Sequence, residues 1–131
     1  MVERSKDWMD QAEGDLERAE HDLKGGFYDW ACFSAQQSAE EAVKAVLQKL
    51  GAEAWGHSVY DLLIELKRNF TIPDDILNSA LELDKAYIPT RYPNAHPSGS
   101  PRRRYTRQEA ERMIQHAKKI LELCKSLLSR T

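Results

Sequence analysis

The sequence lacks the segments that would place a protein in or across a membrane. Its apolar runs are short and interrupted by charged residues, so no part of it is predicted to span a bilayer. The first residues are mixed in charge and have no apolar core of the kind found in secretory signals. These absences predict a cytoplasmic protein with no membrane partner.

Cysteine is also scarce, since the chain has only Cys32 and Cys124. Both lie in helical patterns and have no Cys-x-x-Cys spacing, which disfavours a zinc site. We interpret them as small buried apolar residues in a reducing compartment, the alternative being a disulfide between them. No Glu-x-x-His pair, glycine-rich phosphate loop, nucleophile elbow or EF-hand pattern occurs either, so neither a metal nor a cofactor is predicted.

What the chain does have is the composition of a globular protein. Its 131 residues are 41% hydrophobic and 31% charged, which excludes a disordered chain and allows a sizeable core. We expect a single domain covering residues 1–131.

Apolar residues recur at helical spacing in almost every part of the sequence. The expected helices cover residues 5–24, 28–50 and 59–70, a fourth with Pro73 in its first turn, and a fifth opened by Thr106 and Glu109 as a capping box. No run of residues predicts a strand. The fold class is therefore all-α, an antiparallel up-and-down bundle of four or five helices.

The helix at 28–50 carries a stripe of small residues, namely Ala31, Ala35, Ser38, Ala42 and Ala45. Small side chains let a neighbouring helix backbone approach closely. This pattern predicts that the second helix is the central one.

A long basic loop at about 88–105 separates the last two helices, and it holds four of the five prolines. Proline removes backbone donors and fixes φ, so a long helix cannot continue here. The loop contains Arg91 and His96 five positions apart, a planar cation beside a titratable imidazole. Tyr87, Tyr92 and Tyr105 flank the basic residues, and such rings either stack nucleobases or pack the loop onto the bundle.

Charge is divided unevenly along the chain. Residues 1–84 carry eight Lys/Arg and eighteen Asp/Glu, a net charge of −10, whereas residues 85–131 carry eleven and three, a net charge of +8. The basic half includes Arg102, Arg103 and Arg104, predicted to bind the phosphates of a nucleotide or RNA. The asymmetry favours an anionic partner or a second subunit, and the alternative is a set of solvated arginines.

The other histidines are expected to be structural. His21 and His116 are predicted to be solvated on helix surfaces. His57 precedes the N-cap residue Ser58 and is expected to serve the loop there, the alternative being that it lines a site.

Four segments in order resemble the HEPN family, the higher eukaryote and prokaryote nucleotide-binding domain. They are Asp7-Trp8-x3-Ala12-x2-Asp15-Leu16, Tyr28-x-Trp30-Ala31-x2-Ser34-Ala35-Gln36-Gln37-x2-Glu40-x2-Val43-Lys44-Ala45, His57-Ser58-x3-Leu62-Leu63 and Tyr87-x3-Arg91-Tyr92-Pro93. The resemblance implies a helical bundle that dimerises and binds nucleotide or RNA. Some members pair with a minimal nucleotidyltransferase, and many are metal-independent endoribonucleases with an Arg-x4–6-His motif.

Two functions follow from the resemblance. In the first, the chain is a dimeric binding module that acts with a minimal nucleotidyltransferase in a toxin–antitoxin-like pair, and Tyr87, Arg91, Tyr92 and Arg102–Arg104 contact the ligand. In the second, it cleaves RNA: neutral His96 takes the proton from a ribose 2′-OH and Arg91 stabilises the charge on phosphorus. The sequence favours binding, because Tyr92-Pro93 follows the arginine where the family motif commonly has a polar residue, and Ser98 stands where a tyrosine often follows the histidine.

Overall fold

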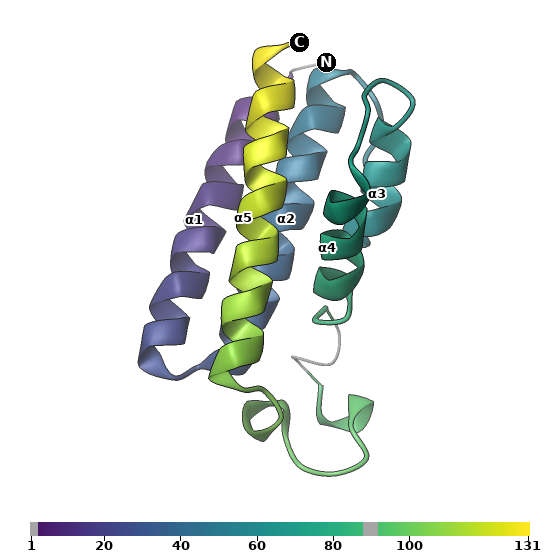
Figure 1. Cartoon of the computed structure of the whole chain (residues 1–131). Helices are drawn as coiled ribbons and strands as arrows, with labels where there is room; N and C mark the ends of the chain where they lie inside the picture. Colours follow the sequence, from purple (N-terminus) through teal and green to yellow (C-terminus); the bar gives the residue numbers. More distant parts are fainter. Residues whose placement is uncertain (1–2, 88–91) are drawn as a thin grey trace.

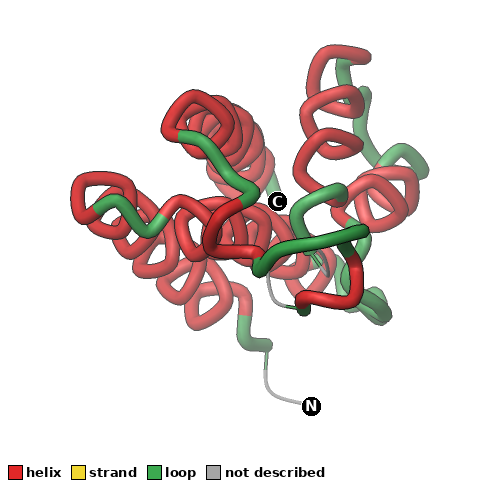
Figure 2. Tube along the Cα trace, turned by 90° about the horizontal axis from the view of Figure 1, so that it is seen from below, coloured by secondary structure: helices red, strands yellow, loops and turns green. Residues whose placement is uncertain are grey.

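The computed structural model of the chain describes residues 3–87 and 92–131. Five α-helices and two short 3₁₀ turns form in this part, and no strand does. Long helices pack antiparallel around α2, and the shorter α3 and α4 pack on one side, as Figure 1 shows. The view in Figure 2, turned by 90°, places α1, α5 and the α3–α4 pair around α2. The predicted all-α bundle is confirmed.

Helix α1 (Ser5–Gly25) and helix α2 (Tyr28–Lys49) are joined by a tight glycine turn. Gly26 adopts φ 81°, a left-handed conformation that glycine reaches without steric cost, and its N–H donates to the last carbonyls of α1. The small residues of α2 are fully buried, and Ser38 Oγ donates to the carbonyl of Ala12 at 2.6 Å. The close approach of α1 to α2 therefore confirms the predicted central position of α2.

Helix α3 (Val59–Leu66) begins as predicted, because Ser58 accepts a hydrogen bond from the N–H of Asp61 at 3.1 Å. The predicted end at residue 70 is wrong. The backbone tightens into turns at residues 67–69, where three successive polar residues offer nothing to bury against the core.

Helix α4 (Asp74–Asp84) begins later than predicted. Pro73 is the N-cap with extended backbone, φ −61° and ψ 148°, and does not lie in the first turn. Helix α5 (Arg107–Ser129) opens with the predicted capping box, in which Thr106 and Glu109 exchange hydrogen bonds. The turns η1 (Pro93–Ala95) and η2 (Pro101–Arg103) interrupt the loop between α4 and α5.

The core is apolar and contains both cysteines as free thiols, one in α2 and one in α5. Burial raises the pKa of each thiol to about 12, so Cys32 and Cys124 stay protonated and pack as apolar groups. Within the described helices, no stretch is long and apolar enough to cross a membrane.

Ion pairs between helices use much of the positive charge of α5. Lys118 and Lys125 bind Glu20 and Glu13 of α1 at 3.2 and 3.0 Å, and Lys119 binds Asp75 of α4 at 3.2 Å. Part of the predicted charge asymmetry is therefore balanced inside the chain and not by a partner.

Candidate functional site

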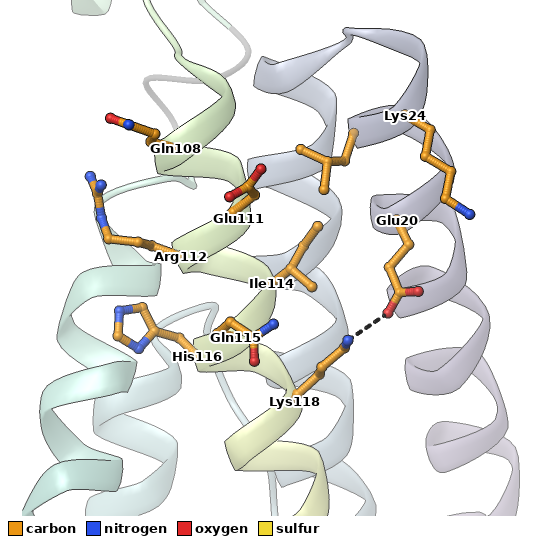
Figure 3. Close-up of a pocket in the computed structure, with 10 residues that line it drawn as sticks. Glu20, Lys24, Gln108, Glu111, Arg112, Ile114, Gln115, His116 and Lys118 are labelled. Carbon is orange, nitrogen blue, oxygen red and sulfur yellow. Dashed lines mark ion pairs between the residues drawn. The ribbon is translucent and has the colours of Figure 1, made fainter.

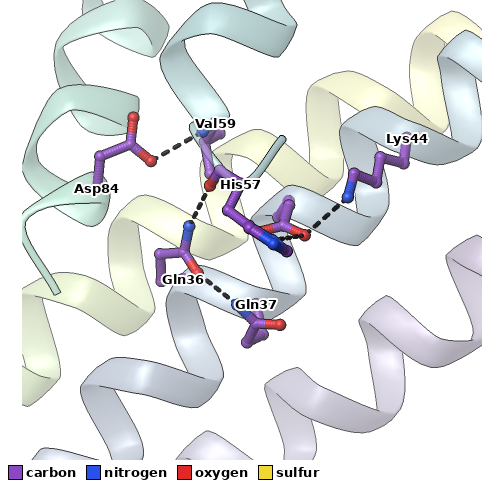
Figure 4. Close-up of polar contacts among 7 residues, drawn as sticks. Gln36, Gln37, Lys44, His57, Val59 and Asp84 are labelled. Carbon is purple, nitrogen blue, oxygen red and sulfur yellow. Dashed lines mark hydrogen bonds and ion pairs between the residues drawn. The ribbon is translucent and has the colours of Figure 1, made fainter. Parts of the chain in front are cut away.

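A polar network lies along α2 where it faces the segment before α3 (Figure 4). Glu40 has a side chain only 4% exposed and accepts a hydrogen bond from Lys44 Nζ at 2.9 Å. Its Oε2 lies 3.2 Å from Nδ1 of His57. Gln36, fully buried, donates from Nε2 to the carbonyl oxygen of His57 at 2.8 Å. The network therefore fixes both the ring edge and the backbone of His57.

The next residues are held by α4. The carboxylate of Asp84, the last residue of α4, accepts hydrogen bonds from Ser58 Oγ at 2.9 Å and from the N–H groups of Val59 and Tyr60 at 2.8 and 3.1 Å. These N–H groups belong to the first turn of α3. The N–H groups of a first turn have no acceptor within their own helix. Asp84 thus caps α3 from another helix and aligns residues 57–60 with the end of α4.

An aromatic row, defined here as Trp30, Phe33, Tyr87 and His57, runs beside this network. The ring of His57 stacks on Tyr87 with centroids 4.8 Å apart and planes 15° from parallel. Tyr87 stacks at 6.1 Å on Phe33, and Phe33 meets Trp30 edge to face at 6.2 Å. Residues from α2, from the segment before α3 and from the turn after α4 thus meet in one row.

Burial and the nearby charge of Glu40 raise the pKa of Tyr87, so its phenol stays neutral. At the other end of the row, the guanidinium of Arg18 lies 5.6 Å from the centre of the Trp30 ring, a cation–π contact. The row therefore has a neutral phenol next to His57 and a cation at Trp30.

The carboxyl groups of Glu41 and Asp15 form a pair between α1 and α2. Burial raises the pKa of Glu41 to about 9, and a hydrogen bond with Asp15 and the charges of Asp15 and Glu40 add to the increase. Oε1 of Glu41 is buried and meets no donor among the described residues. Because an unfolded glutamate loses its proton near pH 4.5, this group stabilises the fold less as pH rises from about 4.5 to 9.

The basic loop is attached to the bundle through Pro101, which is buried where η2 contacts α2. The side chains of Arg102 and Arg103 are exposed. Arg104 donates to the carbonyl oxygen of Ser98 from Nε at 2.7 Å and to the hydroxyl of Ser98 from Nη2 at 2.8 Å. Arg104 therefore orders the loop, and the predicted phosphate contacts of Arg102, Arg103 and Arg104 stay predictions.

The predicted catalytic pair is described only in part. Arg91 lies outside the described residues, so its pairing with His96 stays a prediction. His96 is half-buried and meets the ring of Tyr105 edge to face at 6.0 Å. Tyr92, predicted to contact the ligand, is 54% exposed. Of the predicted site residues that the structure describes, Tyr87 alone belongs to the aromatic row.

Sequence reasoning missed most of the network around His57. Glu40 and Lys44 are four residues apart on the helix predicted to be central, and this spacing was the available signal for a buried ion pair. Nothing in the sequence pointed to Asp84, because its partners lie about 25 residues away in the chain.

Two other predictions about histidines can be compared with the structure. His21 is exposed, as predicted. The prediction for His116 is wrong, because α4 packs against α5 there: Nδ1 lies 2.9 Å from Ser79 Oγ, and burial lowers the pKa of the ring.

A groove lies away from this network. It has a volume of about 680 Å³, runs between α1 and α5 and is crossed by the Glu20–Lys118 ion pair (Figure 3). None of the predicted site residues lines it. The described residues also contain no group of three or more His, Cys, Asp or Glu side chains placed to hold a metal ion.

The antiparallel arrangement of five helices, with a long connection before the last one, places this protein in the class of all-α helical bundles. Comparison with known proteins identifies its family. The chain matches the HEPN domain over residues 5–127 and belongs to the HEPN family. The fold and the resemblance predicted from the sequence are therefore confirmed.

Solved structures agree with this assignment. TT1696 from Thermus thermophilus is 47% identical, with a TM-score of 0.94, over 96% of this chain and 99% of that one. The HEPN domain protein TM0613 from Thermotoga maritima is 56% identical, with a TM-score of 0.79, over 95% and 98%. ST0689, an archaeal HEPN homologue, is 43% identical, with a TM-score of 0.81, over 95% and 98%.

A more distant relative carries a functional name. The protein named "Putative toxin MJ1304" from Methanocaldococcus jannaschii is 29% identical over 136 residues, covering 97% of this chain and 90% of the relative.

Proposed function

We propose that this chain binds the phosphates of a nucleotide or of RNA as a homodimer. In this proposal residues 1–131 act as one HEPN domain in the cytoplasm, together with a minimal nucleotidyltransferase in a toxin–antitoxin-like pair. The name of the M. jannaschii relative and the sequence resemblance support the pairing.

The observation that carries the binding proposal is the contrast between two groups of cations. Lys118, Lys119 and Lys125 of α5 pair with carboxylates of the same chain. Arg102 and Arg103 are exposed on η2, and within residues 3–87 and 92–131 no carboxylate lies within ion-pair distance of them. Two adjacent unpaired guanidinium groups on an anchored turn suit the charged oxygens of phosphate groups.

Replacing Arg102 and Arg103 together with alanine is expected to weaken binding of single-stranded RNA about tenfold or more near 0.1 M salt. The slope of log K against log salt should become shallower by about 1.4, because each lost phosphate contact on a single strand accounts for about 0.7. Fluorescence anisotropy with a labelled decamer at several salt concentrations measures both quantities.

The matched control is Lys118→Ala with Lys125→Ala, which removes the same charge from cations already paired on α5. This variant should bind RNA nearly like the unmodified chain. Equal losses in the two double variants would show that binding responds to net charge alone, and would contradict a specific site on η2.

The cleavage alternative is tested in the same samples with excess EDTA. If the unmodified chain gives products with 2′,3′-cyclic phosphate ends and His96→Ala gives none, the protein is a metal-independent ribonuclease and not a binding module. In the binding module, the RNA stays intact in both proteins.

The homodimer has a separate test. Phe27 and Trp30, near the start of α2, are 53% and 38% exposed, and large exposed aromatic side chains are typical of protein interfaces. Sedimentation equilibrium at micromolar concentration should give twice the mass of the 15.1 kDa chain. A species of 15.1 kDa alone would contradict the dimer.

A further inference from the structure

His57 is an exposed residue that is nevertheless held in place from several directions. Its Nδ1 faces the buried carboxylate of Glu40, its carbonyl oxygen accepts from Gln36, and one face of its ring lies on Tyr87. Its side chain is still 57% exposed. The exposed part of the ring is therefore the edge that carries Nε2 together with the face turned away from Tyr87.

This arrangement keeps the imidazole oriented before any ligand arrives. The hydrogen bond to Gln36 and the capping of the next residues by Asp84 fix the backbone, and Glu40 fixes the rotation of the ring. A side chain that is already ordered loses little entropy when it binds. If His57 only served the turn before α3, its exposed ring would not need to be held in one orientation.

The chemistry around His57 favours a flat neutral group over a phosphate. Glu40 lies against the ring, and Asp84 lies against the adjacent residues. These carboxylates repel an anion, and Lys44 is already engaged by Glu40. The aromatic row supplies stacked rings, and nucleobases stack on such rings whatever their sequence.

The positive charge lies at the same end of the bundle but on another segment. Tyr87 ends the turn after α4, and the basic loop lies at the bottom of Figure 1, where α4 ends and α5 begins. Its turn η2 is anchored on α2 through Pro101. An aromatic part beside carboxylates and a cationic part on the loop therefore offer separate partners for the base and for the phosphates of a nucleotide.

We propose that His57, supported by Tyr87 and oriented by Glu40, is the stacking platform for a nucleobase of the bound nucleotide or single-stranded RNA. This inference rests on the proposed function and adds to it the part of the site that recognises the base. Nε2 of His57 is the group placed to exchange a hydrogen bond with the edge of that base. Arg102 and Arg103 contact the phosphates.

The experiment compares 5′-AMP with ribose 5-phosphate, which has the same phosphate and sugar but no base. Isothermal titration of the unmodified chain should give AMP an affinity about tenfold higher than that of ribose 5-phosphate, as expected for one stacked base. In His57→Ala the two affinities should agree within about twofold, with that of ribose 5-phosphate unchanged. His57→Phe, which keeps a flat ring, should recover part of the preference for AMP.

Two controls separate this inference from the proposed function. His21→Ala, at an exposed histidine of α1, should keep the full preference for AMP. Arg102→Ala with Arg103→Ala should lower the affinities for AMP and for ribose 5-phosphate by the same factor. A decamer of adenylate bound more tightly than AMP, with the same dependence on His57, would identify RNA as the source of the base, and equal affinities would identify a free nucleotide.

The outcomes that overturn the inference are distinct. If the unmodified chain binds AMP and ribose 5-phosphate equally, or if the preference for AMP survives in His57→Ala, His57 is not the base platform and phosphate binding still stands. If the chain binds neither compound nor RNA, the proposed function fails and the platform fails with it.

Discussion

Replacing Lys44 with methionine is expected to lower the free energy of unfolding by about 3–5 kcal/mol. The change leaves the Glu40 carboxylate, whose side chain is 4% exposed, without the ammonium group 2.9 Å away. The carboxylate must then stay charged with His57 as its remaining contact or take up a proton, and both cost free energy. Urea denaturation followed by circular dichroism measures the loss.

Two further variants test this explanation. Lys49→Met removes a lysine of the same helix whose partner, Glu3, lies 3.7 Å away at the surface, and should cost less than about 1 kcal/mol. The double variant Glu40→Gln with Lys44→Met removes both charges and should recover most of the lost stability. If Lys44→Met and Lys49→Met cost the same, the buried ion pair does not hold the bundle together.

The variant Asp84→Ala is expected to destabilise the chain by about 2–3 kcal/mol, because three donors lose their acceptor and hydrogen bonds to charged groups are worth about 1.5–3 kcal/mol. Two of the three donors are backbone N–H groups at the start of α3. Hydrogen exchange should show faster exchange at the Val59 and Tyr60 amides, with the amides in the middle of α1 little changed. Urea denaturation gives the global loss.

The matched control for Asp84 is Asp61→Ala, which removes an exposed carboxylate in the first turn of α3. Its only expected effect is a weaker interaction with the helix dipole, about 0.3–1 kcal/mol. Asp84→Asn keeps one acceptor oxygen, so its loss of stability should lie between those of Asp84→Ala and Asp61→Ala. If Asp84→Ala cost no more than Asp61→Ala, the contact between α4 and α3 would not stabilise the start of α3.

The sequence predicted well those features that depend on neighbouring residues. The capping box at Thr106 and Glu109 involves residues three positions apart, and the start of α5 was predicted correctly. Buried small residues on one face of α2 were also predicted, because helical periodicity fixes which side chains share a face. Errors at the end of α3 and at Pro73 are displacements of a few residues at helix ends, which local patterns define poorly.

The candidate site was predicted less completely. Tyr87 was included for its place beside the basic loop, and the structure puts it in a stack with His57. His57 was expected to serve the turn before α3, the alternative being that it lines a site, and the structure adds its stack on Tyr87. Arg104 was expected to contact phosphate, which stays a prediction, and the structure adds its hydrogen bonds to Ser98. Both added contacts depend on distant residues or on the folding of the loop upon itself.

The sequence by itself determined the helical class, the order of the helices, the family and the basic loop, because each depends on composition or on spacing along the chain. Only the tertiary structure decided that Glu40 and Lys44 are buried as a pair, that Asp84 caps α3, and that His57 and Tyr87 stack. The contacts of Asp84 and of His57 join residues that are remote in sequence. Glu40 and Lys44 are neighbours on α2, but their burial, like the other two contacts, arises only when packing brings the helices together. The free energy of each contact depends on that burial, which no local pattern specifies.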